Sequence, residues 1–180
     1  MDLRSDDELM ELVKKNDERA FEVLYRRHAD AVYGYCMRLF SGNRSQVDDT
    51  CQETWCKVVR RADTYVAPSN FKGWVMRIAR NEAMDLFRKR HPDLSLSEES
   101  APEVPDDFDL EDSLADAFGA QELRAAIDTL PEGQRAVFVL WAEEEASYAE
   151  IGRKLNLEFN SVRALLYRAR QNLRAKLEKK

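Results

Sequence analysis

Cysteine and histidine are scarce in this sequence, and their scarcity excludes several classes of protein. The chain has 180 residues, with three cysteines and two histidines. Three cysteines are too few, and an odd number, for a disulfide framework, and a zinc site needs four nitrogen or sulfur ligands close together. Cys51 and Cys56 have no histidine near them in the sequence. We therefore predict no metal site and expect the cysteines to be buried as small apolar residues.

Long apolar runs are also missing. The longest run, Ala136 to Ala142, has seven residues, whereas a transmembrane helix needs about 20. Residues 1–20 are acidic and amphipathic, and they lack the basic-then-apolar pattern of a secretory signal. Apolar residues make up 44% of the chain, which is enough for a folded core. We expect a globular, cytoplasmic protein.

One segment lacks positive charge altogether. Residues 92–119 contain ten carboxylates and no lysine or arginine, so the net charge of −6 hides two basic parts on either side. The segment 92–110 also contains three prolines, and its composition cannot bury enough apolar surface to offset the entropy of ordering it. We predict a flexible acidic linker at 92–110 between domains at 1–91 and 111–180.

On both sides of this linker, apolar residues recur every three or four positions, as they do in helices. No window has the alternation of a strand bounded by turn residues. Ser5 followed by Glu8 predicts a capping box at the first helix, and Gly42 with Asn43 predicts the end of the second. The fold is predicted to be all-α, with two small helical domains. The later helices are expected at about 46–62, 71–90, 111–128, 132–143, 147–155 and 161–178.

The last two of these helices have the spacing of a helix-turn-helix. Tyr148, Ile151 and Leu155 form the inner stripe of the first helix. Gly152 lies where a missing side chain allows a close approach of the two helices. Asn156 lies where the turn needs a positive φ, which asparagine tolerates better than most residues.

The second helix of this pair has a basic face. Asn160 or Ser161 is expected to cap it, because both side chains can accept a hydrogen bond from the first turn. The outward face is expected to comprise Arg163, Ala164, Tyr167, Arg168 and Arg170. Such a face suits the major groove of DNA and its phosphates. An ordinary helical hairpin with a solvated basic face is the alternative.

A further mixture of aromatic and basic residues opens the helix expected at 71–90. Phe71, Lys72 and Trp74 begin it, and more basic residues follow. Flat rings and cations together suit unstacked single strands, since bases stack on rings and phosphates attract cations. For Trp74 a core position is the slightly favoured interpretation, and composition alone does not decide between the two.

At this point the chain resembles the extracytoplasmic-function (ECF) group of bacterial sigma factors. Six stretches match in the right order and cover both helical parts without the linker. They are Ala20–Leu39, Asp48–Trp55, Phe71–Asn81 with Met84–Asp85, Leu130–Arg135, Tyr148–Gly152 and Val162–Arg170.

The resemblance implies a two-domain initiation factor that binds core RNA polymerase and recognises promoters. The residues implied in polymerase binding are Asp49, Gln52, Glu53 and Trp55. Those implied in reading and opening the −10 element are Tyr65, Ser69, Asn70, Lys72, Trp74, Arg77, Arg80, Asn81 and Arg88, with a flipped base captured by the loop 65–70. Those implied in reading the −35 duplex are Asn160, Ser161, Arg163, Ala164, Tyr167, Arg168 and Arg170. An anti-sigma protein is a further implied partner, and no cofactor is implied.

The sequence departs from the family pattern in the second domain. Asn156 and Asn160 stand where the family usually has glycine, and Leu165 stands at a position that is often basic. The acidic run Glu143–Glu145 replaces a turn that commonly contains glycine. These differences bear on recognition of the −35 element.

Two other functions compete with this interpretation. One is a helix-turn-helix regulator that binds an operator through the second domain alone and does not dock on polymerase. The other is an enzyme, but no nucleophile–base set, glycine-rich phosphate loop or Glu-x-x-His pair is visible. We predict that the protein is not an enzyme.

Overall fold

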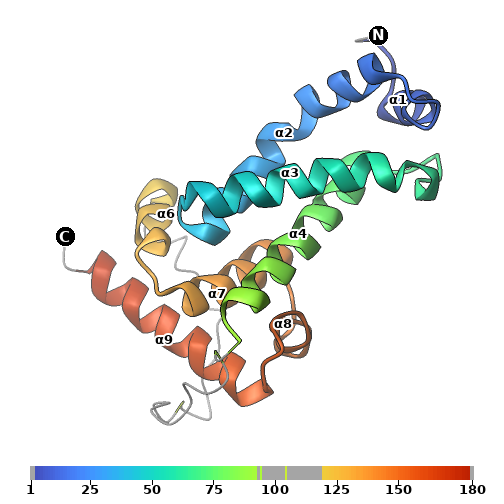
Figure 1. Cartoon of the computed structure of the whole chain (residues 1–180). Coiled ribbons are helices and arrows are strands. Elements are labelled where there is room, and N and C mark those ends of the chain that lie inside the picture. Colours follow the sequence, from blue (N-terminus) through green and yellow to red (C-terminus); the bar gives the residue numbers. More distant parts are fainter. Residues whose placement is uncertain (1–2, 93, 95–103, 105–118, 179–180) are drawn as a thin grey trace. The chain divides into compact units, whose positions relative to one another are not determined.

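The computed structural model describes residues 3–92, 94, 104 and 119–178, and within these ranges it contains helices, turns and loops but no strand (Figure 1). The helices are α1 (Asp6–Val13), α2 (Glu18–Phe40), α3 (Arg44–Arg60), the short 3-10 helix η1 (Ala62–Thr64), α4 (Phe71–Arg90), α6 (Ala120–Asp128), α7 (Glu132–Glu144), α8 (Tyr148–Leu155) and α9 (Phe159–Leu177). The prediction of an all-α fold is confirmed.

The contacts divide the chain into two compact units, Met1–Leu86 and Phe87–Lys180, and the division falls within α4. Most of the linker expected at 92–110 and residues 111–118 lie outside the described residues. The domain limits drawn from the sequence therefore stay a prediction. The single helix expected at about 111–128 is not observed, because Gly119 has extended backbone (φ −63°, ψ 144°) and the helix α6 begins after it. In the described ranges, every helix is too short or too polar to span a lipid bilayer.

The first unit is built on α2, which packs against both α1 and α3. Helix α1 begins with the predicted capping box, in which the Glu8 amide donates to Ser5 Oγ at 3.2 Å and the Ser5 amide donates to Glu8 Oε2 at 2.7 Å. Hydrogen bonds from the backbone amide and the side chain of Ser5 to the carboxylate hold the pKa of Glu8 below its usual value. Helix α2 ends in the left-handed region at Ser41 and Gly42, so the predicted end at Gly42 is confirmed. Asn43, which was expected to help end α2, instead caps α3 by accepting from the Gln46 amide at 3.4 Å.

The second unit has its own apolar core between α6, α7 and α9. The buried members of this core are Ala126, Leu130, Phe138, Ala169, Leu173 and Leu177. Arg135, only 3% exposed, donates from Nη1 to the Leu130 carbonyl at 2.7 Å and so satisfies a backbone acceptor just beyond the end of α6. Burial lowers the pKa of this guanidinium, which nevertheless stays charged.

Candidate nucleic-acid and protein interfaces

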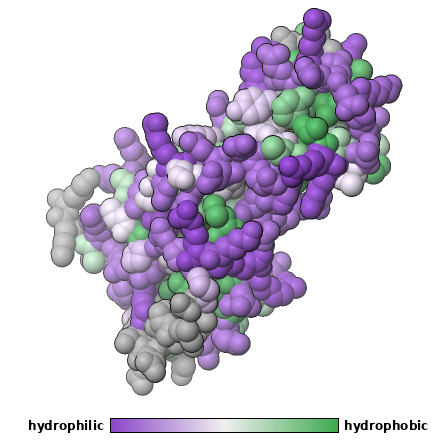
Figure 2. Space-filling view, viewed as in Figure 1, coloured by the Kyte–Doolittle hydropathy of each residue, from purple (hydrophilic) through white to green (hydrophobic). Residues whose placement is uncertain are grey.

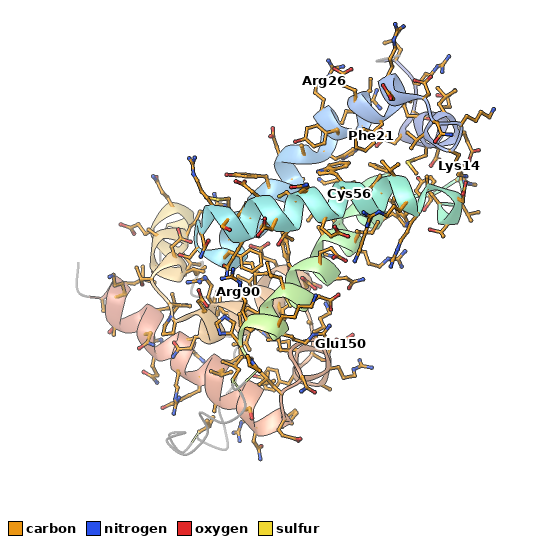
Figure 3. All side chains as sticks on the ribbon, viewed as in Figure 1. Lys14, Phe21, Arg26, Cys56, Arg90 and Glu150 are labelled. Atoms are coloured by element: carbon orange, nitrogen blue, oxygen red, sulfur yellow. The ribbon has the colours of Figure 1, made fainter. Side chains whose placement is uncertain are left out.

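An apolar groove of about 730 Å³ lies between α2 and α3 in the first unit. Its lining residues are Phe21, Tyr25, Tyr33, Asp48, Cys51, Gln52, Trp55, Cys56, Val59 and Arg60. Figure 3 places Phe21 of α2 and Cys56 of α3 between the two helices, and in Figure 2 the mainly hydrophilic surface gives way there to pale and green residues. An exposed apolar groove edged by charges is typical of a surface that binds a helix of another protein.

Three of the lining residues are large apolar side chains that remain exposed to solvent. Tyr25 is 47% exposed, Tyr33 40% and Val59 47%. Trp55 is only 6% exposed and forms part of the groove wall, with its ring centroid 5.0 Å from that of Tyr25 and 6.0 Å from that of Phe21. The aromatic cluster therefore shapes the groove, and the tyrosines are its accessible part.

The four residues expected to bind polymerase all belong to α3 but differ in exposure. Asp49 and Gln52 are exposed, whereas Trp55 is buried and contributes only to the groove wall. The Glu53 side chain is 43% exposed and pairs with Arg60 at 3.3 Å. Helix α3 thus presents acidic and amide groups beside an apolar groove.

The expectation that the cysteines are buried is right for Cys36 and incomplete for the other two. Cys36 has no exposed surface, whereas Cys51 and Cys56 are half-buried and line the groove. The structure describes all three as free thiols, and its described residues contain no cluster of potential metal ligands.

The loop 65–70 and the first turns of α4 carry most of the residues expected to act at the −10 element. Tyr65 is buried at 1% exposure, and its ring packs against Phe71 at 5.9 Å and Trp74 at 5.3 Å between centroids. Asn70 caps α4, because its Oδ1 accepts from the Gly73 amide at 3.1 Å. The loop is thus anchored by a core tyrosine at its start and a helix cap at its end.

The remaining members of this set lie along α4. Trp74 is half-buried, so it is shared between the core and the surface. Arg80 is also partly buried, with its guanidinium 5.9 Å from the centre of the Tyr35 ring. The exposed members are Ser69, Asn70, Lys72, Arg77, Asn81 and Arg88.

Helices α8 and α9 form the predicted helix-turn-helix. Ser147 and Glu150 close a capping box at α8, and hydrogen bonds from Ser147 lower the pKa of the Glu150 carboxyl. Asn156 adopts the predicted left-handed conformation, with φ 57°. A side chain at Gly152 would place its Cβ 2.7 Å from the carbonyl oxygen of Leu157, so the close approach is to the turn itself.

Helix α9 begins earlier than expected. Its first residue is Phe159, and Glu158 occupies the cap position without a side-chain hydrogen bond. The prediction that Asn160 or Ser161 caps this helix is therefore wrong: both lie inside the first turn. Phe159 is 56% exposed and packs against Tyr148 of α8 at 5.6 Å between ring centroids.

The face of α9 expected to meet DNA is narrower than the sequence suggests. Ser161, Ala164 and Arg170 are buried, with at most 8% of their surface exposed. The expectation that Ala164 and Arg170 lie on the outward face is therefore wrong for the described structure. The residues of the set that retain exposure are Asn160, Arg163, Tyr167 and Arg168.

The acidic run before the helix-turn-helix has structural roles. Glu145 ends α7 in the left-handed region at φ 50°, the conformation for which glycine is normally preferred. The Glu144 side chain, only 4% exposed, forms an ion pair with Lys154 of α8. The run thus ends α7 and ties it to α8.

A helix-turn-helix with basic residues on its second helix is typical of DNA-binding proteins, and the first unit carries an exposed apolar groove. Comparison with known families matches a model to each of the two units. A family model described as Sigma-70 region 2 matches residues 24–92, and one described as Sigma-70, region 4 matches residues 120–173.

Individual relatives give the same result. The chain is 38% identical over 165 residues to the ECF RNA polymerase sigma factor SigE of Mycolicibacterium smegmatis, covering 89% of this chain and 62% of that protein. It is 31% identical to SigW of Bacillus subtilis, covering 92% of each. The solved structure of CnrH in complex with the cytosolic domain of CnrY is 26% identical, covers 97% of each chain and superposes with a TM-score of 0.50.

The chain therefore belongs to the ECF RNA polymerase sigma factors, a family of promoter-specific transcription initiation factors. This assignment does not favour the operator-binding regulator that the helix-turn-helix alone would allow.

Sequence reasoning missed the contribution of α2 to the groove. Phe21 and Tyr25 belong to the apolar stripe of that helix and Tyr33 does not, and the sequence pattern assigns none of the three to a binding surface. Their spacing of four and eight residues, which places them along one side of the helix, is the signal that could have separated them from the core positions.

Proposed function

We propose that both units of this chain take part in promoter recognition. The first unit carries one protein-binding and one DNA-binding surface, and the second unit carries another DNA-binding surface. The observation that carries this proposal is the presence, in one chain, of a helix-turn-helix and an exposed apolar groove on a different helical unit. A regulator that only binds duplex DNA has no need for the groove.

The α3 surface binds core RNA polymerase. Asp49, Gln52 and Glu53 supply charged and polar contacts, and the groove beside them receives apolar side chains of a polymerase helix. Tyr25, which is nearly half exposed, supports this role because aromatic side chains are enriched at the centres of protein interfaces. Trp55 acts indirectly, by holding the groove wall in shape.

The loop 65–70 and α4 act at the −10 element. The loop receives a base flipped out of the promoter, and the exposed Lys72 and Arg77 contact the backbone of the opened strand. Trp74, half-buried at the start of α4, lies close enough to the surface to stack on the adjacent base. Arg80 and Asn81 extend this surface, and Arg88 extends it toward the end of the helix.

Helix α9 reads the −35 element as duplex. Arg163 and Arg168 are its best candidates for base or phosphate contacts, with Tyr167 between them and Asn160 in the first turn. On the buried side of α9, Ser161, Ala164 and Arg170 hold the helix in position.

The proposed partners follow from these surfaces. Core polymerase and promoter DNA are the primary ones, and we place the protein in the cytoplasm because bacterial polymerase works there. A protein inhibitor of the anti-sigma type is a further proposed partner, since CnrH was solved in complex with the cytosolic domain of CnrY. The role proposed is that of a specificity factor without enzymatic activity of its own.

The deciding experiment combines the purified chain with core RNA polymerase of the same bacterium and a library of random promoters. Mapping transcript 5′ ends should give defined starts, above the background of core polymerase alone, that share two upstream elements. Tight binding of the chain alone to duplex DNA, without any added initiation, would instead favour the operator-binding regulator.

A further inference from the structure

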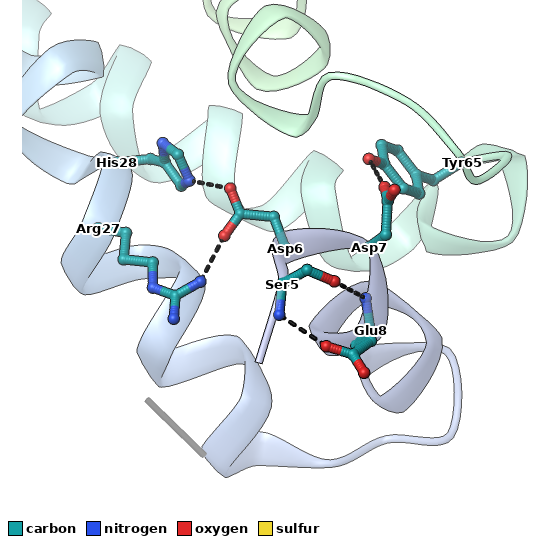
Figure 4. A network of polar contacts seen from close by, with 7 residues as sticks. All are labelled: Ser5, Asp6, Asp7, Glu8, Arg27, His28 and Tyr65. Carbon is teal, nitrogen blue, oxygen red and sulfur yellow. Dashed lines mark hydrogen bonds and ion pairs between the residues drawn. The ribbon is translucent and has the colours of Figure 1, made fainter. Parts of the chain in front are cut away.

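The first turn of α1 connects two parts of the first unit that are distant in sequence (Figure 4). Asp6 accepts hydrogen bonds from Arg27 Nη1 at 2.6 Å and from His28 Nε2 at 2.7 Å, both on α2. Asp7, the next residue, points to the loop before α4. Successive residues of a helix differ in direction by about 100°, so the two neighbouring carboxylates serve different partners.

Asp7 holds the loop 65–70 at two points. One carboxylate oxygen accepts a hydrogen bond from the Tyr65 hydroxyl, and the other accepts from the Ser69 amide at 3.3 Å. Between these two points, Val66 is 76% exposed and residues 67 and 68 are also exposed. The carboxylate therefore links the two ends of a loop whose middle is in solvent.

The chemistry of these contacts favours a fixed geometry. A carboxylate that accepts a phenol and an amide at once has both oxygens oriented, and bonds to a charged acceptor are stronger than bonds between neutral groups. Burial and the Asp7 carboxylate raise the pKa of Tyr65 well above its usual value, so the hydroxyl remains a donor at physiological pH.

The helix that carries Asp7 is itself well anchored. The capping box of Ser5 and Glu8 fixes the first turn of α1, and the pairing of Asp6 with Arg27 and His28 attaches that turn to α2. Buried Leu9 and Met10 follow in the next turn. Asp7 thus projects from a rigid support, which a positioning group requires.

We propose that Asp7 is a positioning residue for promoter opening: its carboxylate holds Tyr65 and Ser69 so that the loop 65–70 keeps the shape that receives a flipped base of the −10 element. This inference rests on the proposed function of the loop. It assigns a role in DNA opening to α1, a helix that contributes none of the residues expected to touch DNA.

The test uses the full chain in complex with core polymerase and a single-stranded −10 oligonucleotide from a promoter selected in the library experiment. A second set of oligonucleotides carries an abasic site at each position of that element in turn. The wild-type complex should bind the intact strand more tightly than the strand that lacks the captured base. The ratio of these two affinities measures base capture, separately from contacts with the backbone.

The variant Asp7→Asn keeps the size of the side chain and removes its charge. We expect it to lower the affinity for the intact strand about tenfold, which corresponds to the loss of one charge-assisted hydrogen bond. The affinity for the abasic strand and the affinity for core polymerase should not change. Tyr65→Phe, which keeps the ring and loses the hydroxyl, should act in the same direction. The double variant should lose little more than Asp7→Asn alone, because both changes break one contact.

Glu11→Ala is the matched control, since it removes a carboxylate from the same helix, one that pairs with Lys14 at 2.6 Å. It should leave both affinities unchanged. The inference is overturned if Asp7→Asn retains the wild-type ratio, or if it weakens the intact and abasic strands equally, as a general loss of structure would. Equal binding of both strands by the wild-type complex would instead refute base capture by the loop, and the inference with it.

Discussion

Gly152 lies so close to the turn after α8 that the effect of Gly152→Ala on stability can be worked out from the structure. Replacing this glycine with alanine would place a Cβ 2.7 Å from the carbonyl oxygen of Leu157, well inside van der Waals contact. The obstructing atom belongs to the backbone, and the Leu157 amide is held by a hydrogen bond of 2.9 Å to the Gly152 carbonyl. The turn cannot move aside without lengthening that bond.

Two effects of Gly152→Ala oppose each other. Alanine gains about 1 kcal/mol of helix propensity over glycine, whereas overpacking against backbone costs about 1–3 kcal/mol. Since the contact is severe, we expect the cost to prevail and the variant to lose about 1–2 kcal/mol of stability in the free energy of unfolding. For a unit of this size, that loss corresponds to a melting temperature about 5–10 °C lower.

Gly34→Ala is the matched control for this experiment. Its Cβ would lie 3.3 Å from a terminal nitrogen of the flexible Arg38 side chain, which can move at little cost. Thermal unfolding followed by circular dichroism should show Gly34→Ala unchanged or slightly stabilised and Gly152→Ala clearly destabilised. Equal or higher stability of Gly152→Ala would refute the argument that the turn backbone limits this position.

The remaining predictions concern the surfaces. Glu53→Lys should weaken the affinity for core polymerase at least tenfold, measured by co-elution, and leave the fold intact, because its surface pair with Arg60 contributes little stability. Glu11→Lys breaks a similar pair on α1 and should keep normal binding. Arg163→Ala and Arg168→Ala should each weaken promoter binding by about 1–3 kcal/mol in a gel-shift titration, and unchanged affinity in both would remove α9 from DNA contact. The pKa of Glu150 is lower in the folded than in the unfolded state, so its contribution to stability is present above the unfolded pKa and is lost as the pH falls through the folded pKa. In Glu150→Gln, the melting temperature measured at a series of pH values should therefore fall less steeply on the acid side than in the wild type.

Much of the fold was predictable because it depends on neighbours in the chain. The capping box at Ser5 and the left-handed turn at Asn156 involve residues within a few positions, and both are predicted from the sequence. The capping box of Ser147 and Glu150 has the same spacing and is found only in the structure. The start of α9 was misplaced because Glu158 takes the cap position without the side-chain hydrogen bond that a sequence pattern relies on.

The surfaces were predictable only in part. The set on α3 was recognised from its resemblance to a family, yet burial of Trp55 and exposure of Tyr25 depend on how α2 packs beside α3. In the same way, Arg170 belongs to a basic helix by sequence and is buried in the structure.

By itself, the sequence determined the all-helical fold, the cap of the first helix, the helix-turn-helix and the family, because each follows from local spacing or from an ordered set of short matches. The tertiary structure alone decided which side chains share a site. Asp7 and Tyr65 are 58 residues apart, and no pattern in the chain indicates that they meet. Only the packing of α1 against α2 brings a carboxylate of the first turn to the loop before α4, and so joins the N-terminal helix to the proposed −10 surface.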